Sequence, residues 1–359
     1  MKSKKQYLLF ILLFLALIFG TYYFILKDYS LIDFIKSLSN CNLSYIWILL
    51  ILLFLYASFD AVFLKRMLFH FGKKVKFYNA FGYFFTETYF SAITPSSMGG
   101  QPVQMYEMNN DKINCRISSI VVLLNTILYK IALLVITFIA VPFYLKDIFN
   151  QDNLFNILII LGIVTNILVI ILFIAMVYSK KTLPKMINKL ISFGSKIHII
   201  KNKEEKMKKF NEALKDYQRC AILTREKPII LVEGFIYMLL QRLSLLSISY
   251  VIYLSFGFNS LSYVELIAFQ ACITLASDFV PLPGGVVVSE SLLLKINSFI
   301  YMETLATSSM VLLRGISFYF LVIVSAIFYL IFKSLKREKA NPNLATGEIE
   351  ISLTDLEIL

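Results

Sequence analysis

The sequence has few of the residues that build metal centres and hydrolytic active sites. It contains two histidines, His70 and His198, and both lie in basic connecting segments, where a surface histidine is the expected role. Its four cysteines have no paired spacing, so neither a disulfide framework nor a zinc site is indicated. No glycine-rich nucleotide-binding motif is visible. We therefore expect no catalytic residue, no metal, no cofactor and no nucleic-acid partner.

Charged residues are also scarce, because they make up only 16% of the 359 residues while hydrophobic residues make up 58%. A mean hydropathy of +0.74 excludes a soluble domain. Several apolar runs reach the length of about 20 residues that spans a bilayer. The first run, 7–26, is longer than the apolar part of a signal peptide and lacks an Ala-x-Ala-like cleavage site, so a retained helix is predicted. The sequence predicts an all-α, multi-pass protein of a bacterial cytoplasmic membrane.

The net charge of +12 is distributed unevenly, and this predicts which connecting segments face the cytoplasm. Positive charge collects at the N-terminus and in 65–76, 180–227 and 333–339. Cytoplasmic loops of membrane proteins carry an excess of Lys and Arg, so these four segments are expected inside. The short connecting segments between the other apolar runs have little or no net positive charge and are expected outside. Both chain termini are therefore predicted to be cytoplasmic.

Two segments share an unusual pattern, in which Pro and a Gly pair end an apolar run and a Glu follows. The pattern reads TPSSMGGQPVQMYE in the first half and PLPGGVVVSE in the second. Helix breakers at matching points of two hydrophobic halves are typical of the broken helices that surround transporter binding sites. The predicted break positions are Pro95, Gly99, Gly100, Pro281, Pro283, Gly284 and Gly285.

Charge and breakers together predict two broken hairpins that enter the membrane from opposite sides. Segment 77–116 must begin and end inside, whereas segment 262–299 must begin and end outside. The predicted fold has about six spanning helices plus two re-entrant hairpins, arranged as an inverted-topology repeat. A second interpretation has eight ordinary spanning helices with the Pro-Gly segments as loops, because Pro and Gly are common in membrane helices.

The same reasoning divides the chain into six parts. The basic loop has fourteen Lys or Arg against five Asp or Glu from 180 to 227, so we expect a polar connector, or else a segment attracted to anionic lipid. The parts are an N-terminal helix with an external connector (1–43), a first membrane repeat (44–141) with its hairpin (77–116), a linking helix (142–178), the basic cytoplasmic loop (179–228), a second membrane repeat (229–332) with its hairpin (262–299), and a cytoplasmic tail (333–359).

Ionisable residues inside apolar runs are few, and each costs roughly 2.5–3.5 kcal/mol at a helix centre. Lys130 and Arg314 are expected mid-helix at equivalent places in the two repeats. Each of these two cations is expected either to form a structural ion pair or to bind the phosphate of a lipid. Asp60 lies near the end of the helix expected at 44–64. A solvated position at that helix end is therefore the alternative to a place inside the membrane. The candidate substrate-binding residues are Lys130, Arg242, Arg314, Gln101, Gln104 and Glu290, and the candidate proton carriers are Glu87 and Asp278.

The sequence resembles a known family, the lysylphosphatidylglycerol synthase transmembrane region, which is a flippase-like membrane domain. The resemblance rests on TPSSMGGQPVQ and PLPGGVVVSES, on the Arg314 helix and on the order of apolar segments, and it covers about residues 5 to 335. Members are similar to the N-terminal membrane half of the bacterial multiple peptide resistance factor. Gln101 and Gln104 stand where many members have an acid and an arginine, and Val287 stands where a glycine is frequent, which leaves headgroup preference open.

The resemblance implies a flippase that moves a phospholipid, or an aminoacylated or glycosylated lipid, through a cavity between the two hairpins. Without an ATP-binding motif, the movement is expected to be downhill or ion-coupled. No aminoacyltransferase domain is expected after the last helix, so a transferase partner would be encoded separately. Two alternatives stand beside this prediction. One is a phosphatidylglycerol lysyltransferase component that affects resistance to cationic antimicrobial peptides, and the other is a membrane scaffold for a lipid-modifying enzyme.

Overall fold

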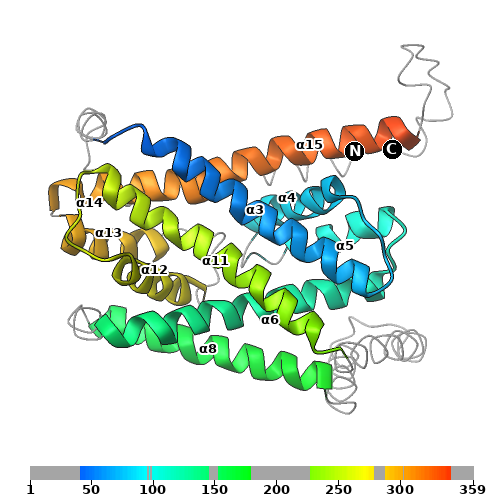
Figure 1. Ribbon diagram of the computed structural model, residues 1–359, viewed down its shortest axis with the longest axis horizontal. Coiled ribbons are helices and arrows are strands. Elements are labelled where there is room, and N and C mark those ends of the chain that lie inside the picture. Colours follow the sequence, from blue (N-terminus) through cyan, green and yellow to red (C-terminus); the bar gives the residue numbers. More distant parts are fainter. Residues whose placement is uncertain are drawn as a thin grey trace, which may run out of the picture.

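The computed structural model describes residues 41–94, 97, 99–144, 153–178, 227–278, 288–301 and 303–340, and every regular element in them is a helix (Figure 1). Four of these described helices are long and apolar enough to cross a membrane: Tyr45–His70, Cys115–Phe143, Ile229–Ser255 and Leu305–Lys336. The prediction of an all-α membrane protein is therefore confirmed. The predicted helix 7–26, residues 179–226 of the basic loop and residues 341–359 of the tail lie outside the described residues, as do Pro95, Pro281, Pro283, Gly284 and Gly285. Residues 333–340, predicted as the start of the tail, are instead helical and continue the last long helix to Ala340.

The two predicted membrane repeats contain similar series of helices. The first contains α3 (Tyr45–His70), α4 (Phe77–Ile93), α5 (Gly100–Asn110), α6 (Cys115–Ala140) and the short 3-10 helix η3 (Val141–Tyr144). The linking helix is α8 (Asn153–Tyr178). The second contains α11 (Ile229–Ser255), α12 (Tyr263–Asp278), α13 (Val288–Tyr301), α14 (Glu303–Arg314), the π-helical segment η5 (Gly315–Phe320) and α15 (Leu321–Ala340).

Each half contains a pair of short helices that pack against each other, α4 with α5 and α12 with α13. The two pairs lie toward opposite ends of the long axis of the molecule (Figure 1). In the first pair, a Cβ atom on Gly100 would lie 2.4 Å from the Glu87 backbone oxygen, so only glycine permits this close approach. The re-entrant depth of these pairs and the inverted-topology repeat stay predictions.

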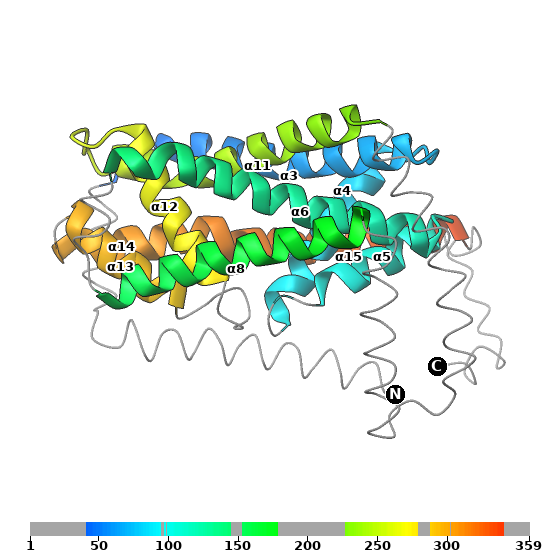
Figure 2. The same cartoon turned by 90° about the horizontal axis from the view of Figure 1, so that it is seen from below.

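The first long helix of each half, α3 and α11, pack together along one side of the molecule (Figure 2). They run antiparallel, because opposite ends meet. At one end the Cys41 Sγ donates to the Ser255 Oγ over 2.9 Å. At the other end Arg66 Nε donates to the Glu233 carboxylate, and His70 Nε2 lies 2.8 Å from Glu233 Oε2. Both helices end at a glycine with a left-handed backbone, Gly72 after α3 and Gly257 after α11.

The largest apolar core joins α3, α4, α6, α11 and α15, and it holds these helices at fixed positions around the interior. Aromatic side chains bury a large apolar area each, and several of them belong to this core. Its buried members include Phe63, Leu64, Met67, Tyr83, Phe84, Leu128, Met238 and Phe332. A second core joins α3, α11, α12, α13 and α14 at the other end. The polar interior described next lies between helices that these two cores anchor.

Candidate functional site

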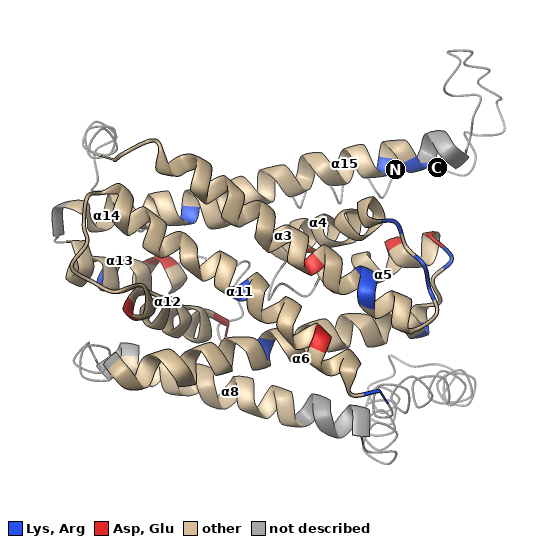
Figure 3. Cartoon of the chain, in the orientation of Figure 1, with Lys and Arg blue, Asp and Glu red and all other residues tan. Residues whose placement is uncertain are grey.

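A polar cavity of about 720 Å³ lies between the two halves of the chain. Its walls come from α3, α4, α5 and α6 of the first half and from α11 to α15 of the second. Charged residues are isolated along these mostly uncharged helices (Figure 3). Six of them nevertheless line this one cavity: Asp60, Glu87, Lys130, Arg242, Asp278 and Arg314. Ionisable groups inside apolar helices are expensive, so their convergence makes this cavity the candidate functional site.

Lys130 of α6 is held by partners on two other helices. Its Nζ lies 3.7 Å from the Asp278 Oδ2 of α12 and donates to the Asn166 Oδ1 of α8 over 2.8 Å. The Tyr129 hydroxyl donates to the same Asp278 oxygen over 2.6 Å. Of the two roles that the sequence allows for Lys130, the geometry gives it a structural ion pair, and this pair also involves the predicted proton carrier Asp278.

Arg314, at the end of α14, has a similar arrangement. Its Nε lies 3.2 Å from the Glu290 Oε1 of α13, and Glu290 is only 1% exposed. The Tyr319 hydroxyl donates to the same oxygen over 3.3 Å, and the Arg314 guanidinium lies 4.6 Å from the centre of the Phe318 ring. The π-helical segment η5 begins directly after Arg314, and such segments often occur at functional sites. Both Lys130 and Arg314 therefore face the cavity with a carboxylate beside them.

The direct contacts that the structure gives Arg242 of α11 are with neutral groups instead. Its Nε donates to Gln241 Oε1 over 2.8 Å, and its Nη2 donates to the Tyr56 hydroxyl over 3.3 Å. Its guanidinium carbon lies 4.2 Å from the centre of the Tyr129 ring and 5.3 Å from that of Tyr56. These cation–π contacts hold the guanidinium between two aromatic rings at the cavity wall.

Asp60 also lines the cavity, although the sequence allowed a solvated position for it at the end of its helix. The structure buries it, with 6% exposed, because α3 continues to His70 instead of ending near residue 64. Its carboxylate accepts from Gln241 Nε2 over 2.6 Å and from Asn125 Nδ2 over 3.3 Å. The basic residues Lys65 and Arg66 suggested an early end to the helix. Their position on its last turns shows that a spanning helix can extend past its apolar part.

The remaining predicted site residues divide between the cavity and its surroundings. Glu87 lines the cavity and accepts from Ser91 Oγ over 2.9 Å. Gln101 also lines it, and its Nε2 donates to Thr126 Oγ1 over 2.8 Å, which ties α5 to α6. Gln104 is buried beside the Tyr83 carbonyl and is not a lining residue. Gly99 and Gly100 lie where α5 begins, and the other predicted breakers lie outside the described residues.

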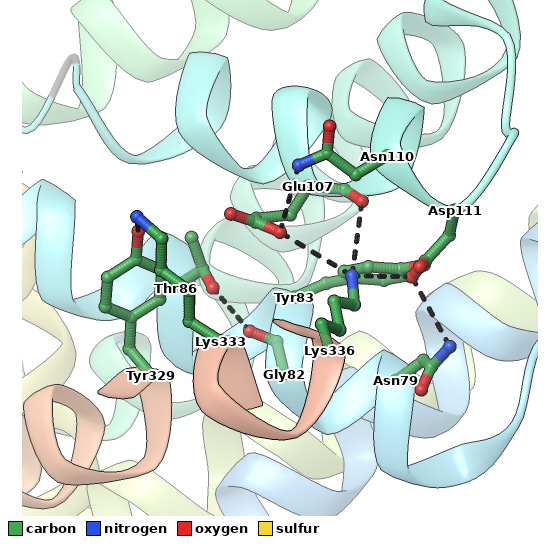
Figure 4. A network of polar contacts seen from close by, with 10 residues as sticks. All are labelled: Asn79, Gly82, Tyr83, Thr86, Glu107, Asn110, Asp111, Tyr329, Lys333 and Lys336. Carbon is green, nitrogen blue, oxygen red and sulfur yellow. Dashed lines mark hydrogen bonds and ion pairs between the residues drawn. The ribbon is translucent and has the colours of Figure 1, made fainter. Parts of the chain in front are cut away.

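A second polar network lies outside the cavity, where α15 meets α4 and α5 (Figure 4). Lys336 Nζ lies 2.9 Å from Asp111 Oδ2 and 3.5 Å from Glu107 Oε2. Asp111 also accepts from the Tyr83 hydroxyl and from Asn79 Nδ2. Because this network joins three helices through side chains that do not line the cavity, we assign it a structural role.

Comparison with protein families agrees with this architecture. The model of the family described as the lysylphosphatidylglycerol synthase TM region matches residues 8–325, which is most of the chain. No curated protein matches the sequence. The matched range includes every helix that contributes to the cavity, from α3 to the start of α15.

Proposed function

The chain belongs to the lysylphosphatidylglycerol synthase TM region family, and we propose that it translocates the headgroup of a lipid across the bacterial cytoplasmic membrane. The single observation that supports this proposal is the charged cavity between the two halves. The cargo is a phospholipid, or an aminoacylated or glycosylated lipid. The headgroup crosses through the cavity while the acyl chains stay in the bilayer.

The size and lining of the cavity suit this function. Its volume of about 720 Å³ lies within the range of roughly 300–1,000 Å³ that is usual for ligand pockets. Polar side chains in its wall replace the water that a headgroup loses when it leaves the membrane surface. Since both halves of the chain form the wall, movement of one half against the other would change the side from which the headgroup has access. Glu87, a candidate proton carrier, lines the same cavity.

A plug in the cavity tests the proposal. Thr274 lines the cavity on α12 and bonds to the Gln270 carbonyl of its own helix. Thr165 of α8 makes the same type of bond to Leu161 and is not a lining residue. In proteoliposomes that carry fluorescent phospholipids, we expect Thr274→Trp to reduce translocation to the protein-free rate, because the indole ring occupies space that the headgroup needs. Thr165→Trp should translocate at the wild-type rate.

Two results would contradict the proposal. One is wild-type protein that moves no lipid faster than protein-free vesicles, and the other is equal translocation by the plugged and wild-type proteins. Purified protein incubated with labelled lysyl-tRNA and phosphatidylglycerol separates the enzymatic alternative, because lysine transfer to the lipid would identify a transferase component.

A further inference from the structure

We propose that the cavity contains a headgroup site with two poles, in which Arg242 binds a phosphate and the carboxylates of Asp60 and Glu87 bind a cationic amine. This inference rests on the proposed function and names the lipid class, a phospholipid with an ammonium group in its headgroup. It also separates the three cavity cations by role. Lys130 and Arg314 support the wall, and Arg242 is the phosphate ligand.

The first step of the argument is the distribution of ion pairs. Lys130 and Arg314 each have a carboxylate oxygen within 4 Å, at 3.7 Å and 3.2 Å. Arg242 forms no ion pair with any residue in the described part of the chain, although it is partly buried at the cavity wall. A cation at membrane depth normally has an anionic partner, because the isolated charge is costly. Arg242 is therefore the cavity cation that is available to an anion brought by the cargo.

The second step is the geometry of the Arg242 guanidinium. Arginine has five N–H donors in a planar fork that matches the oxygens of a phosphate. Gln241 takes the Nε donor and the Tyr56 hydroxyl lies beside Nη2, while no residue in the described ranges accepts from Nη1. The rings of Tyr56 and Tyr129 fix the plane of the guanidinium before any ligand arrives. A cation held in this way loses little conformational entropy on binding a phosphate.

The third step concerns the two carboxylates. Asp60 accepts from the amides of Gln241 and Asn125, and Glu87 accepts from Ser91, but neither forms an ion pair with a described residue. The orientation of Gln241 follows from its neighbours. Its oxygen accepts from Arg242, so its nitrogen must donate to Asp60. Gln241 thus separates the cationic pole from the anionic pole by one amide group, and both poles belong to one cavity.

The fourth step is charge balance. With the Lys130 and Arg314 pairs neutral, the cavity presents one cation, Arg242, and two carboxylates, Asp60 and Glu87. Asp60, Glu87 and Asp278 all interact electrostatically with Arg242, although none of them is within ion-pair distance of its guanidinium. An inorganic phosphate or an anionic lipid would satisfy Arg242 but would face two carboxylates of like charge. A headgroup with a sugar and no ionic groups would leave both poles unpaired. A phosphodiester that bears an ammonium group satisfies both poles.

Binding of water-soluble, short-chain lipids to the detergent-solubilised full chain tests this site. We expect dihexanoyl-phosphatidylethanolamine to bind at least about tenfold more tightly than dihexanoyl-phosphatidylglycerol, because only the former supplies an ammonium group for the carboxylates. Arg242→Gln should weaken the binding of both lipids by at least about tenfold, because it removes charge-assisted hydrogen bonds to phosphate. Asp60→Asn, which preserves shape, should weaken binding of the ethanolamine lipid and leave or strengthen that of the glycerol lipid.

The matched control is Arg66→Gln, because Arg66 lies at the end of α3 outside the cavity and its side chain is 45% exposed. It should bind both lipids as the wild type does. A thermal melt of each variant identifies loss of folding, and if Arg242→Gln is unfolded, Arg242→Lys serves in its place. Lys retains the charge and lacks the planar fork, so weaker binding of both lipids is again expected.

Several results would overturn the two-pole site. They are equal affinity of the wild type for the two lipids, unchanged binding in folded Arg242 variants, and inorganic phosphate that competes as effectively as the ethanolamine lipid. The last result would identify a site for free phosphate instead of a lipid headgroup. Wild-type protein that translocates lipids without headgroup preference would overturn this site and leave the proposed function intact. Selective binding without translocation would support this site and contradict the proposed function.

Discussion

Replacing Lys336 with methionine is expected to lower the free energy of unfolding by about 3 kcal/mol, because it leaves the buried Glu107 and the partly buried Asp111 without their cation. Lys336 Nζ lies 2.9 Å from Asp111 Oδ2 and 3.5 Å from Glu107 Oε2. The Glu107 side chain is only 4% exposed. Methionine preserves much of the contact with Phe332, whose ring centre lies 4.2 Å from Nζ. The loss therefore reports the charge and not the packing.

An equilibrium unfolding titration in mixed detergent micelles measures this effect. Lys65→Met is the matched control, because Lys65 is exposed on α3 and lies outside the network. It should change the free energy of unfolding by less than about 0.5 kcal/mol. Adding Glu107→Gln to Lys336→Met should restore part of the lost stability, since it removes an uncompensated charge. A Lys336→Met variant as stable as the wild type would contradict a stabilising role for these ion pairs.

Gly162→Ala is expected to displace α8 from α12 and to destabilise the protein by about 1–3 kcal/mol, the usual range for overpacking. A Cβ atom at position 162 would lie 2.3 Å from the Leu275 backbone oxygen and 2.6 Å from the Leu275 carbonyl carbon. Backbone atoms of a helix cannot move aside alone, so one helix must shift against the other. The shift should also reduce lipid translocation, since Asn166, one turn later on α8, accepts from Lys130 at the cavity.

Replacement of glycine by alanine at position 315 is expected to have the opposite effect on stability. Apart from its chain neighbours and the backbone of its own helix, no atom lies within 4 Å of the Cβ position at Gly315, so no overlap with another element opposes the change. Alanine has a helix propensity about 1 kcal/mol better than that of glycine, so this variant should be as stable as the wild type or more stable. Thermal melts of the two variants in detergent, measured side by side, test the comparison. Equal melting temperatures would contradict the close contact between α8 and α12.

Part of the candidate site could be predicted from the sequence, because a charged residue within an apolar run stands out without any structure. Lys130, Arg242, Arg314, Glu87 and Asp278 were found in this way, and the structure places all five on one cavity. Gln101 and Gln104 came from the motif, but only Gln101 lines the cavity. For Asp60 the sequence also allowed a solvated position, because the apolar run does not show how far α3 extends.

The partners of these charges required the tertiary structure. Asp278 and Glu290 lie 148 and 24 residues from the cations that they pair with, Lys130 and Arg314. From the sequence, several acidic residues were equally plausible partners, since the pairing depends on which sides of the helices contact each other. The same packing decides that Arg242 lies between two tyrosine rings and forms no ion pair within the described ranges.

By itself, the sequence determined that this is a helical membrane protein of a particular family, because hydropathy, charge bias and two short motifs are local properties of the chain. It also determined which few residues bear charge inside the apolar segments. Only the tertiary structure decided which of those charges neutralise one another and which stay available in the cavity. Ion pairing depends on distances of a few ångströms between helices far apart in the chain, and these distances are set by how side chains pack, not by their order.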